Sequence, residues 1–135
     1  MGMRILPLVL SILLGGCTWL QPKSPEERVL ERAEAHLAAL RAGDFAEALT
    51  YTTPSFQASA KARRYGALYS AAPAWRQAEV YRVDCPAGDA ELKCEAHTRI
   101  HPFVPPHIQA NITDLPVSVK ADWLFLDGNW YRYED

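Results

Sequence analysis

The sequence predicts an α+β domain in which three N-terminal helices pack on a curved antiparallel sheet. Two observations predict this class. Residues 24–72 repeat apolar side chains at helical spacing, and from Trp75 onward the apolar period changes to two. Of the 135 residues, 49% are hydrophobic and 22% are charged, which is enough apolar mass for one core. The formal net charge is -2, so the chain lacks the excess of basic residues that nucleic-acid-binding proteins show. This argues against a nucleic-acid partner.

The first helix has a defined beginning and end in the sequence. Ser24, Pro25 and Glu27 match a capping box with proline at the first helical position, so the helix should begin at Pro25. Gly43 is placed to end it in a left-handed conformation. The apolar stripe between these ends consists of Leu30, Ala33, Leu37 and Leu40.

Two further helices should precede the sheet. Asp44 and Glu47 offer a second capping box, for a short helix that runs through about Tyr51 and folds back on the first. The run Thr-Thr-Pro then breaks it. Residues 55–72 are rich in Ala, Lys and Arg and predict a third helix, which Pro73 stops.

Residues 76–85 and 91–100 predict a hairpin in which Cys85 lies directly opposite Cys94. Directly opposed Cα atoms lie about 4.5–5.5 Å apart, which suits a disulfide. Such a bond persists in an oxidising compartment. The same register sets Val83 opposite Ala96, Arg82 opposite His97, Tyr81 opposite Thr98 and Val80 opposite Arg99.

A second hairpin should close the sheet. Residues 115–126 alternate, with Val117, Val119, Ala121, Trp123 and Phe125 on one side. Asp127-Gly128 is a two-residue turn signal that sets Phe125 opposite Trp130 and Leu124 opposite Tyr131. Between the hairpins, residues 101–114 contain three prolines and predict an irregular crossover.

The N-terminus carries an export signal. Residues 5–16 form an apolar run whose helix would cover roughly 18 Å, too short for a bilayer core of about 30 Å. The run ends in Leu14-Gly15-Gly16-Cys17, which resembles the lipobox of bacterial lipoprotein precursors. The resemblance implies cleavage by signal peptidase II between Gly16 and Cys17 and acylation of Cys17 with chains such as palmitate. An ordinary secreted protein with a chance cysteine is the alternative.

These features divide the chain into a signal peptide (1–16), a tether (17–23) and one domain (24–135). Thr18, in place of Asp, resembles the sorting signal for the outer membrane. We therefore expect a lipid-anchored outer-membrane protein that faces the periplasm. More than one acyl chain is needed there, because a single chain gives only reversible attachment.

The element order resembles the NTF2-like superfamily, which includes ketosteroid isomerase and SnoaL-like branches. The motifs that carry the resemblance are Gly43-Asp44-Phe45 with Ala48, and Trp123-x-Phe125-x-Asp127-Gly128-x-Trp130. It covers roughly residues 25–134 and implies a pocket between the concave sheet and the first helices. An unrelated two-layer α+β domain without a cavity is the alternative.

Candidate pocket-lining residues are Tyr51, Tyr65, Tyr69, Tyr81, Asp122, Trp123 and Trp130. The isomerase branch uses an acidic proton shuttle with hydrogen-bond donors to an oxyanion, roles open to Asp122 and the tyrosines. None of them lies in a recognisable catalytic motif, so no catalytic residue is predicted. The alternative for Asp122 is an exposed strand position on the face of Ser118 and Lys120.

No metal and no cofactor are expected. His97 and His101 lie four residues apart in a strand, roughly 13 Å from each other, too far to share one zinc ion. The histidines are expected at the surface or in loops, and His36 at the edge of the core with a hydrogen bond.

The sequence therefore predicts a lipid-anchored periplasmic binding or interaction module that is not catalytic. A small-pocket enzyme of the ketosteroid isomerase or SnoaL-like type and a structural component of an envelope assembly are the alternatives. Expected partners are the membrane, through the lipid, and either an envelope protein or a small apolar ligand. A homodimer is also open, since NTF2-like domains often pair through their sheets.

Overall fold

The computed structural model describes residues 2, 21–88, 92–109 and 115–135. Cys17, its cleavage site and the predicted signal lie outside the described residues. Within the described part, none of the helices combines the length and apolar character that crossing a bilayer requires. The elements are α1 (Pro25–Arg41), α2 (Phe45–Leu49), α3 (Pro54–Gln57), η2 (Ala60–Arg64), α4 (Tyr65–Leu68), η3 (Ala72–Ala74), β1 (Gln77–Asp84), β2 (Lys93–His101), α5 (Pro106–Gln109), β3 (Val117–Leu126) and β4 (Asn129–Arg132).

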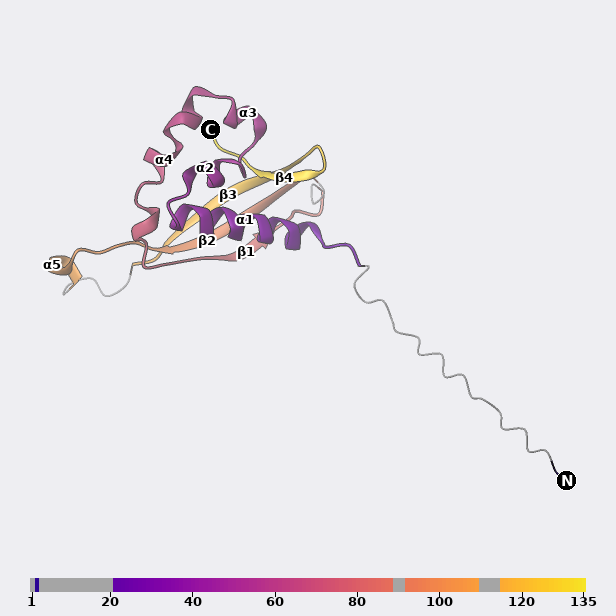
Figure 1. Cartoon of the computed structure of the whole chain (residues 1–135). Helices are drawn as coiled ribbons and strands as arrows, with labels where there is room; N and C mark the ends of the chain where they lie inside the picture. The colour runs from indigo at the N-terminus through magenta and orange to yellow at the C-terminus, as the bar shows by residue number, and fades with distance from the viewer. Residues whose placement is uncertain (1, 3–20, 89–91, 110–114) are drawn as a thin grey trace.

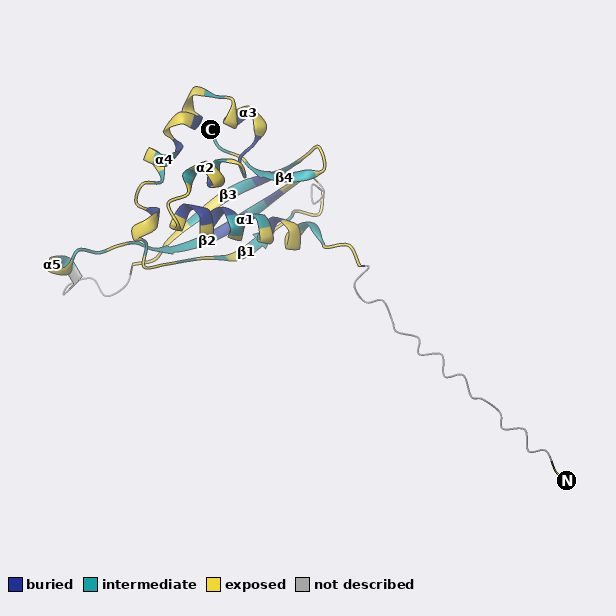
Figure 2. Ribbon diagram, in the orientation of Figure 1, coloured by how far each residue is buried: buried dark blue, intermediate teal, exposed yellow. Residues whose placement is uncertain are grey.

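The predicted α+β architecture is confirmed. The strands form one antiparallel sheet in the order β1-β2-β3-β4, and α1 lies along one face of it (Figure 1). We call the face toward α1 the inner face and the opposite one the outer face. Buried stretches appear on α1 and on the strands (Figure 2), and Val29 and Ala33 of α1 share a buried cluster with Ala96 and Trp123 of the sheet. The core therefore lies between α1 and the inner face.

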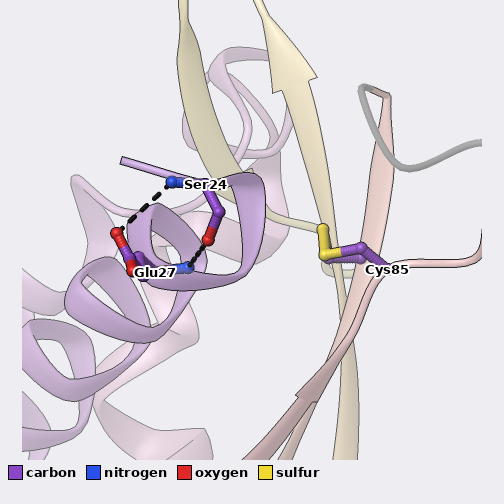
Figure 3. The surroundings of a disulfide bond; sticks show 4 residues. Ser24, Glu27 and Cys85 are labelled. Atoms are coloured by element: carbon purple, nitrogen blue, oxygen red, sulfur yellow. Dashed lines mark hydrogen bonds between the residues drawn. A yellow bond between two sulfur atoms is a disulfide. The ribbon is translucent and has the colours of Figure 1, made fainter. Parts of the chain in front are cut away.

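Helix α1 begins and ends as predicted. The Ser24 hydroxyl accepts a hydrogen bond from the Glu27 N–H, and the Glu27 carboxylate accepts one from the Ser24 N–H (Figure 3). Gly43 follows the helix with a φ of 74°, the left-handed conformation that glycine adopts without strain. The second capping box forms only in half. Asp44 caps the Glu47 N–H, but its own N–H bonds the Ala39 carbonyl.

The prediction of one continuous third helix is wrong. Residues 54–74 form four short helical segments instead, which are α3, η2, α4 and η3. The reason is tertiary packing, because Phe56 and Tyr65 are both buried in one cluster with Leu40. Nine residues apart on a straight helix, at 3.6 residues per turn, these rings would point in roughly opposite directions. The breaks turn both of them inward.

The first hairpin is confirmed near its disulfide and corrected beyond it. Val83 pairs with Ala96 and Arg82 with His97, as predicted. A bulge at Tyr81 then shifts the register by one residue, so that Thr98 pairs with Val80 and not with Tyr81. A bulge inserts one extra residue into a strand. It therefore leaves Val80 on the inner face and places Tyr81 on the outer face.

The disulfide between Cys85 and Cys94 is present, with an S–S distance of 2.03 Å (Figure 3). Cys94 is fully buried among Val29, Ala33 and Trp123, so the bridge is part of the core beneath α1.

The closing hairpin has the predicted register. Phe125 pairs with Trp130 and Leu124 with Tyr131. Asp127 and Gly128 take φ values of 48° and 84°, the left-handed pair that a two-residue hairpin turn requires.

Candidate functional site

A cavity of about 230 Å³ lies between α1 and the inner face of the sheet. Apolar side chains from both layers form most of its wall, and Leu68 and Trp75 border it from the segment that follows α2. Its lining consists of Ala33, His36, Leu37, Leu40, Leu68, Tyr69, Trp75, Ala96, Thr98, Ile100, Val119, Trp123 and Arg132.

Trp123, which contributes to the wall of this cavity, carries an unsatisfied donor. Its ring is completely buried, and its indole Nε1–H has no hydrogen-bond partner among the described residues. Leaving a buried donor unpaired costs about 1–3 kcal/mol. An acceptor that reached this N–H would recover that cost.

A polar network lies beside the cavity. The Glu134 carboxylate accepts hydrogen bonds from Arg132 Nε at 2.6 Å and from the Tyr69 hydroxyl at 2.9 Å. The Tyr65 hydroxyl lies 3.5 Å from the same carboxylate oxygen and 2.6 Å from His36 Nε2. The network therefore connects α1 to the C-terminal segment through Tyr65.

The chain path explains how these residues meet. The Arg132 N–H donates to the Tyr51 carbonyl at 2.7 Å, and the Thr53 N–H donates to the Arg132 carbonyl at 3.1 Å. These bonds hold the end of β4 against the chain that follows α2. Arg132 also pairs with Trp123 across β3 and β4, which places its side chain on the inner face.

Burial determines the ionisation of this network. Burial, with a further contribution from the Arg132 charge, lowers the pKa of His36 to about 3, so its imidazole is neutral at pH 7. Burial also raises the pKa of Tyr65 and Tyr69, so both remain hydroxyl donors. Burial opposes the charge of Arg132, but the adjacent Tyr69 and Glu134 oxygens hold the pKa of its guanidinium above its ordinary value.

His36 is poorly suited to act as a general base at neutral pH. A general base needs a pKa near the working pH, and His36 lies far below it. The hydrogen bonds that the Glu134 carboxylate accepts from Arg132 and Tyr69 both go to Oε1. The cavity has a largely apolar wall, to which the neutral His36 and Tyr69 and the Glu134-paired Arg132 also contribute.

The sequence-predicted site residues separate into three places. Tyr69 and Trp123 line the cavity, and Tyr65 lies behind its wall in the hydrogen-bonded network. Tyr51 and Trp130 border a different groove of about 440 Å³ beside the first half of α1.

Tyr81 and Asp122 are corrections, because both lie on the outer face. The bulge turns Tyr81 away from α1, and its hydroxyl hydrogen-bonds Ser118 Oγ at 2.7 Å. Asp122 pairs with Lys93 at 3.3 Å, as its alternation with the buried Trp123 requires. Asp122 is therefore an outer-face strand residue and not an acid of the cavity.

Sequence reasoning missed Arg132 and Glu134. The signal available was alternation, because Arg132 falls at an inward position opposite Trp123. His36 is also more deeply placed than expected, since it is buried in the core and touches the cavity. The expectation of surface or loop histidines is likewise wrong for His97, which is 2% exposed.

No family model and no curated protein matches the chain. Solved structures do resemble it. A SEC-C motif protein of Rhodopseudomonas palustris superposes with a TM-score of 0.52 at 14% identity, over 84% of this chain and 79% of that one. A Campylobacter jejuni protein assigned as an NTF2-like transpeptidase superposes with a TM-score of 0.51 at 11% identity, over 78% of this chain and 97% of that one. At these identities the likeness concerns the fold alone. The chain has the NTF2-like fold, with helices packed on a curled antiparallel sheet.

Proposed function

We propose that this protein is a lipid-anchored binding module on the periplasmic side of the outer membrane. Its cavity binds a small, mostly apolar molecule that carries one hydrogen-bond acceptor. The observation that carries the proposal is the largely apolar cavity wall, in which Trp123 carries a buried Nε1–H without a partner among the described residues.

The cavity also indicates the class of ligand. Its volume of about 230 Å³ lies below the roughly 300–1,000 Å³ of pockets for drug-sized ligands, so the ligand is small. The Arg132 charge is balanced by Glu134 at 2.6 Å, and His36 is neutral at pH 7. A neutral molecule with a carbonyl or ether oxygen therefore fits better than an ion.

A ketone probe tests the cavity. Acetophenone, which joins an apolar ring to one carbonyl, should bind the purified protein and change its tryptophan fluorescence. Trp123→Phe keeps an aromatic ring but removes the donor, and should weaken binding by about tenfold, the equivalent of one hydrogen bond. Val119→Trp should abolish binding because it fills the cavity from β3.

The matched control is Lys120→Trp, which adds the same ring on the outer face, where Lys120 is exposed. It should bind acetophenone like the unmodified protein. Unchanged binding by Val119→Trp would contradict the proposed site. Mass spectrometry of small molecules extracted from the protein after purification from membranes would then identify the natural ligand.

The anchor rests on the lipobox-like run that ends in Cys17 and on the disulfide, which suits an oxidising compartment. Metabolic labelling with a fatty-acid analogue should mark the unmodified chain and the Cys85→Ala variant, but not Cys17→Ala. Labelled protein should fractionate with the outer membrane. Equal labelling of Cys17→Ala would refute the anchor without affecting the binding proposal.

A small-pocket enzyme is the second candidate, and one observation favours it: Glu134 lies beside the Tyr69 hydroxyl near the cavity. If it is an enzyme, the protein should exchange the methyl protons of acetophenone in deuterated water, and Glu134→Gln should stop the exchange. A pure binding module should bind the ketone without accelerating exchange. Proton NMR distinguishes the two outcomes.

A further inference from the structure

The outer face of the β1–β2 hairpin gathers three metal-ligating side chains. The register places Asp84 directly opposite Glu95, and His97 follows two residues later on the same face of β2. One ligand atom from each residue lies within 4.8 Å of the others. The alternation of the two paired strands thus brings these groups together on the face opposite the cavity.

Three charged side chains approach the same ring nitrogen of His97, Nε2. Its Nε2 lies 3.0 Å from Asp84 Oδ2 and 2.9 Å from Glu95 Oε1. Arg82 Nη2 approaches the same nitrogen at 3.3 Å. A ring nitrogen carries either one proton or one lone pair, so His97 Nε2 cannot hydrogen-bond all three neighbours at once. Asp84 Oδ2 has Arg82 Nε as a second partner at 2.9 Å, which leaves the imidazole to Glu95. A cation bound among the three ligand atoms would replace these contacts.

Burial holds the imidazole in place while leaving the carboxylates accessible. His97 is 2% exposed, and the ring of Tyr81, turned outward by the bulge, lies 6.0 Å from it. The Arg99 guanidinium in turn stacks on the Tyr81 ring, 4.4 Å from its centroid. The side chains of Asp84 and Glu95 are 49% and 37% exposed. An ion can therefore enter from solvent and meet a fixed nitrogen ligand.

We propose that Asp84, Glu95 and His97 form a binding site for a divalent transition metal, of the class to which Zn²⁺ belongs. Nitrogen and carboxylate oxygen are ligands that such ions accept at about 2.0–2.2 Å. Two ligands at that distance from one ion, separated by about 90°, lie roughly 3 Å apart, which matches the separations of both carboxylates from His97 Nε2. Water would complete the coordination.

Two cationic side chains beside the site compete with a metal ion for its carboxylates. Arg82 Nε pairs with Asp84 Oδ2 at 2.9 Å, and Lys120 Nζ lies 3.9 Å from Glu95 Oε1. A metal ion must displace Arg82 from Asp84, and it is repelled by both cations. Removal of the Arg82 charge should therefore strengthen metal binding, an effect that a purely structural ion-pair cluster would not produce.

The spacing of histidines along one strand missed this site, although the register predicted for the first hairpin also sets Asp84 opposite Glu95. Two of the three ligands come from β2 and one from β1, and only the pairing register brings them together.

Calorimetric titration with ZnCl2 tests the proposal on the full chain, purified without a histidine tag and stripped with EDTA. The unmodified protein should bind one Zn²⁺ per chain. Asp84→Asn and Glu95→Gln should each weaken binding by about tenfold or more, since even second-shell losses cost that much. Arg82→Gln should bind Zn²⁺ more tightly than the unmodified protein. Because Asp84 and Glu95 are partly exposed, both variants should fold, which circular dichroism checks.

His107→Ala is the matched control, because His107 is an exposed histidine on α5 and should leave Zn²⁺ affinity unchanged. Nitrogen-15 NMR of the histidine rings should show Zn²⁺ perturbing Nε2 of His97. The proposal is overturned if the unmodified protein does not bind Zn²⁺, or if folded Asp84→Asn and Glu95→Gln bind it as tightly. It is equally overturned if the ring signals that move belong to another histidine.

Discussion

Lowering the pH should destabilise the folded protein at His36, because this buried imidazole is neutral in the fold. Its ordinary pKa of 6.5 falls to about 3 in the folded protein, so between these values the unfolded chain binds more protons at this site. The stability that His36 contributes is therefore complete above pH 6.5 and is lost progressively as the pH falls toward 3. From these two pKa values, the loss between pH 7 and pH 5 is about 2 kcal/mol.

The assay is urea unfolding, followed by circular dichroism, of the unmodified protein and of His36→Gln at pH 7 and pH 5. Glutamine retains a polar group for the Tyr65 hydroxyl but does not titrate in this range. Whatever the variant costs at pH 7, its further loss at pH 5 should be smaller than that of the unmodified protein by about 2 kcal/mol.

His107→Gln provides the control, since it makes the same substitution at an exposed histidine on α5. Equal losses for His36→Gln and the unmodified protein would refute the assignment of a buried neutral imidazole at position 36.

Three further predictions concern the core and its edges. Replacing Cys85 and Cys94 together by alanine should lower the free energy of unfolding by about 2–3 kcal/mol, because a loop of about 10 residues is no longer closed; an unchanged urea midpoint would contradict this. Glu134→Gln should cost about 3 kcal/mol by leaving a largely buried guanidinium unpaired, whereas Glu79→Gln, in an exposed pair, should cost under about 1 kcal/mol. Similar unfolding energies for the two variants would show that burial is unimportant here. Ser24→Ala should cost about 1 kcal/mol through the lost cap, measured by thermal unfolding, and no change in midpoint would argue against the capping box.

Local signals predicted much of this fold because their physics acts over a few residues. Ser24 and Glu27 satisfy helix N–H groups three positions away, and Asp127-Gly128 can take the positive φ that a hairpin turn needs. The alternation of the strands was sufficient to place Cys85 near Cys94 and so to predict their disulfide. Each of these features depends on neighbours in sequence or on one pairing register.

The predictions that were wrong concern features that depend on residues far apart in the sequence. Residues 55–72 have helical propensity, yet Phe56 and Tyr65 must both reach one cluster, and tertiary packing overrides propensity. The bulge at Tyr81 adds one residue to a strand whose alternation gave no sign of it. That single residue moved Tyr81 out of the predicted pocket and placed it over His97.

The sequence by itself determined where the first helix begins, how the second hairpin closes and which cysteines pair. Each of these follows from hydrogen bonds and periodicity between residues that are close along the chain or directly opposed. The tertiary structure alone decided which polar groups face one another. His36 meets Tyr65 beside a small cavity, and Arg132 meets Tyr69 there. These encounters depend on packing angles between layers, which no local pattern encodes.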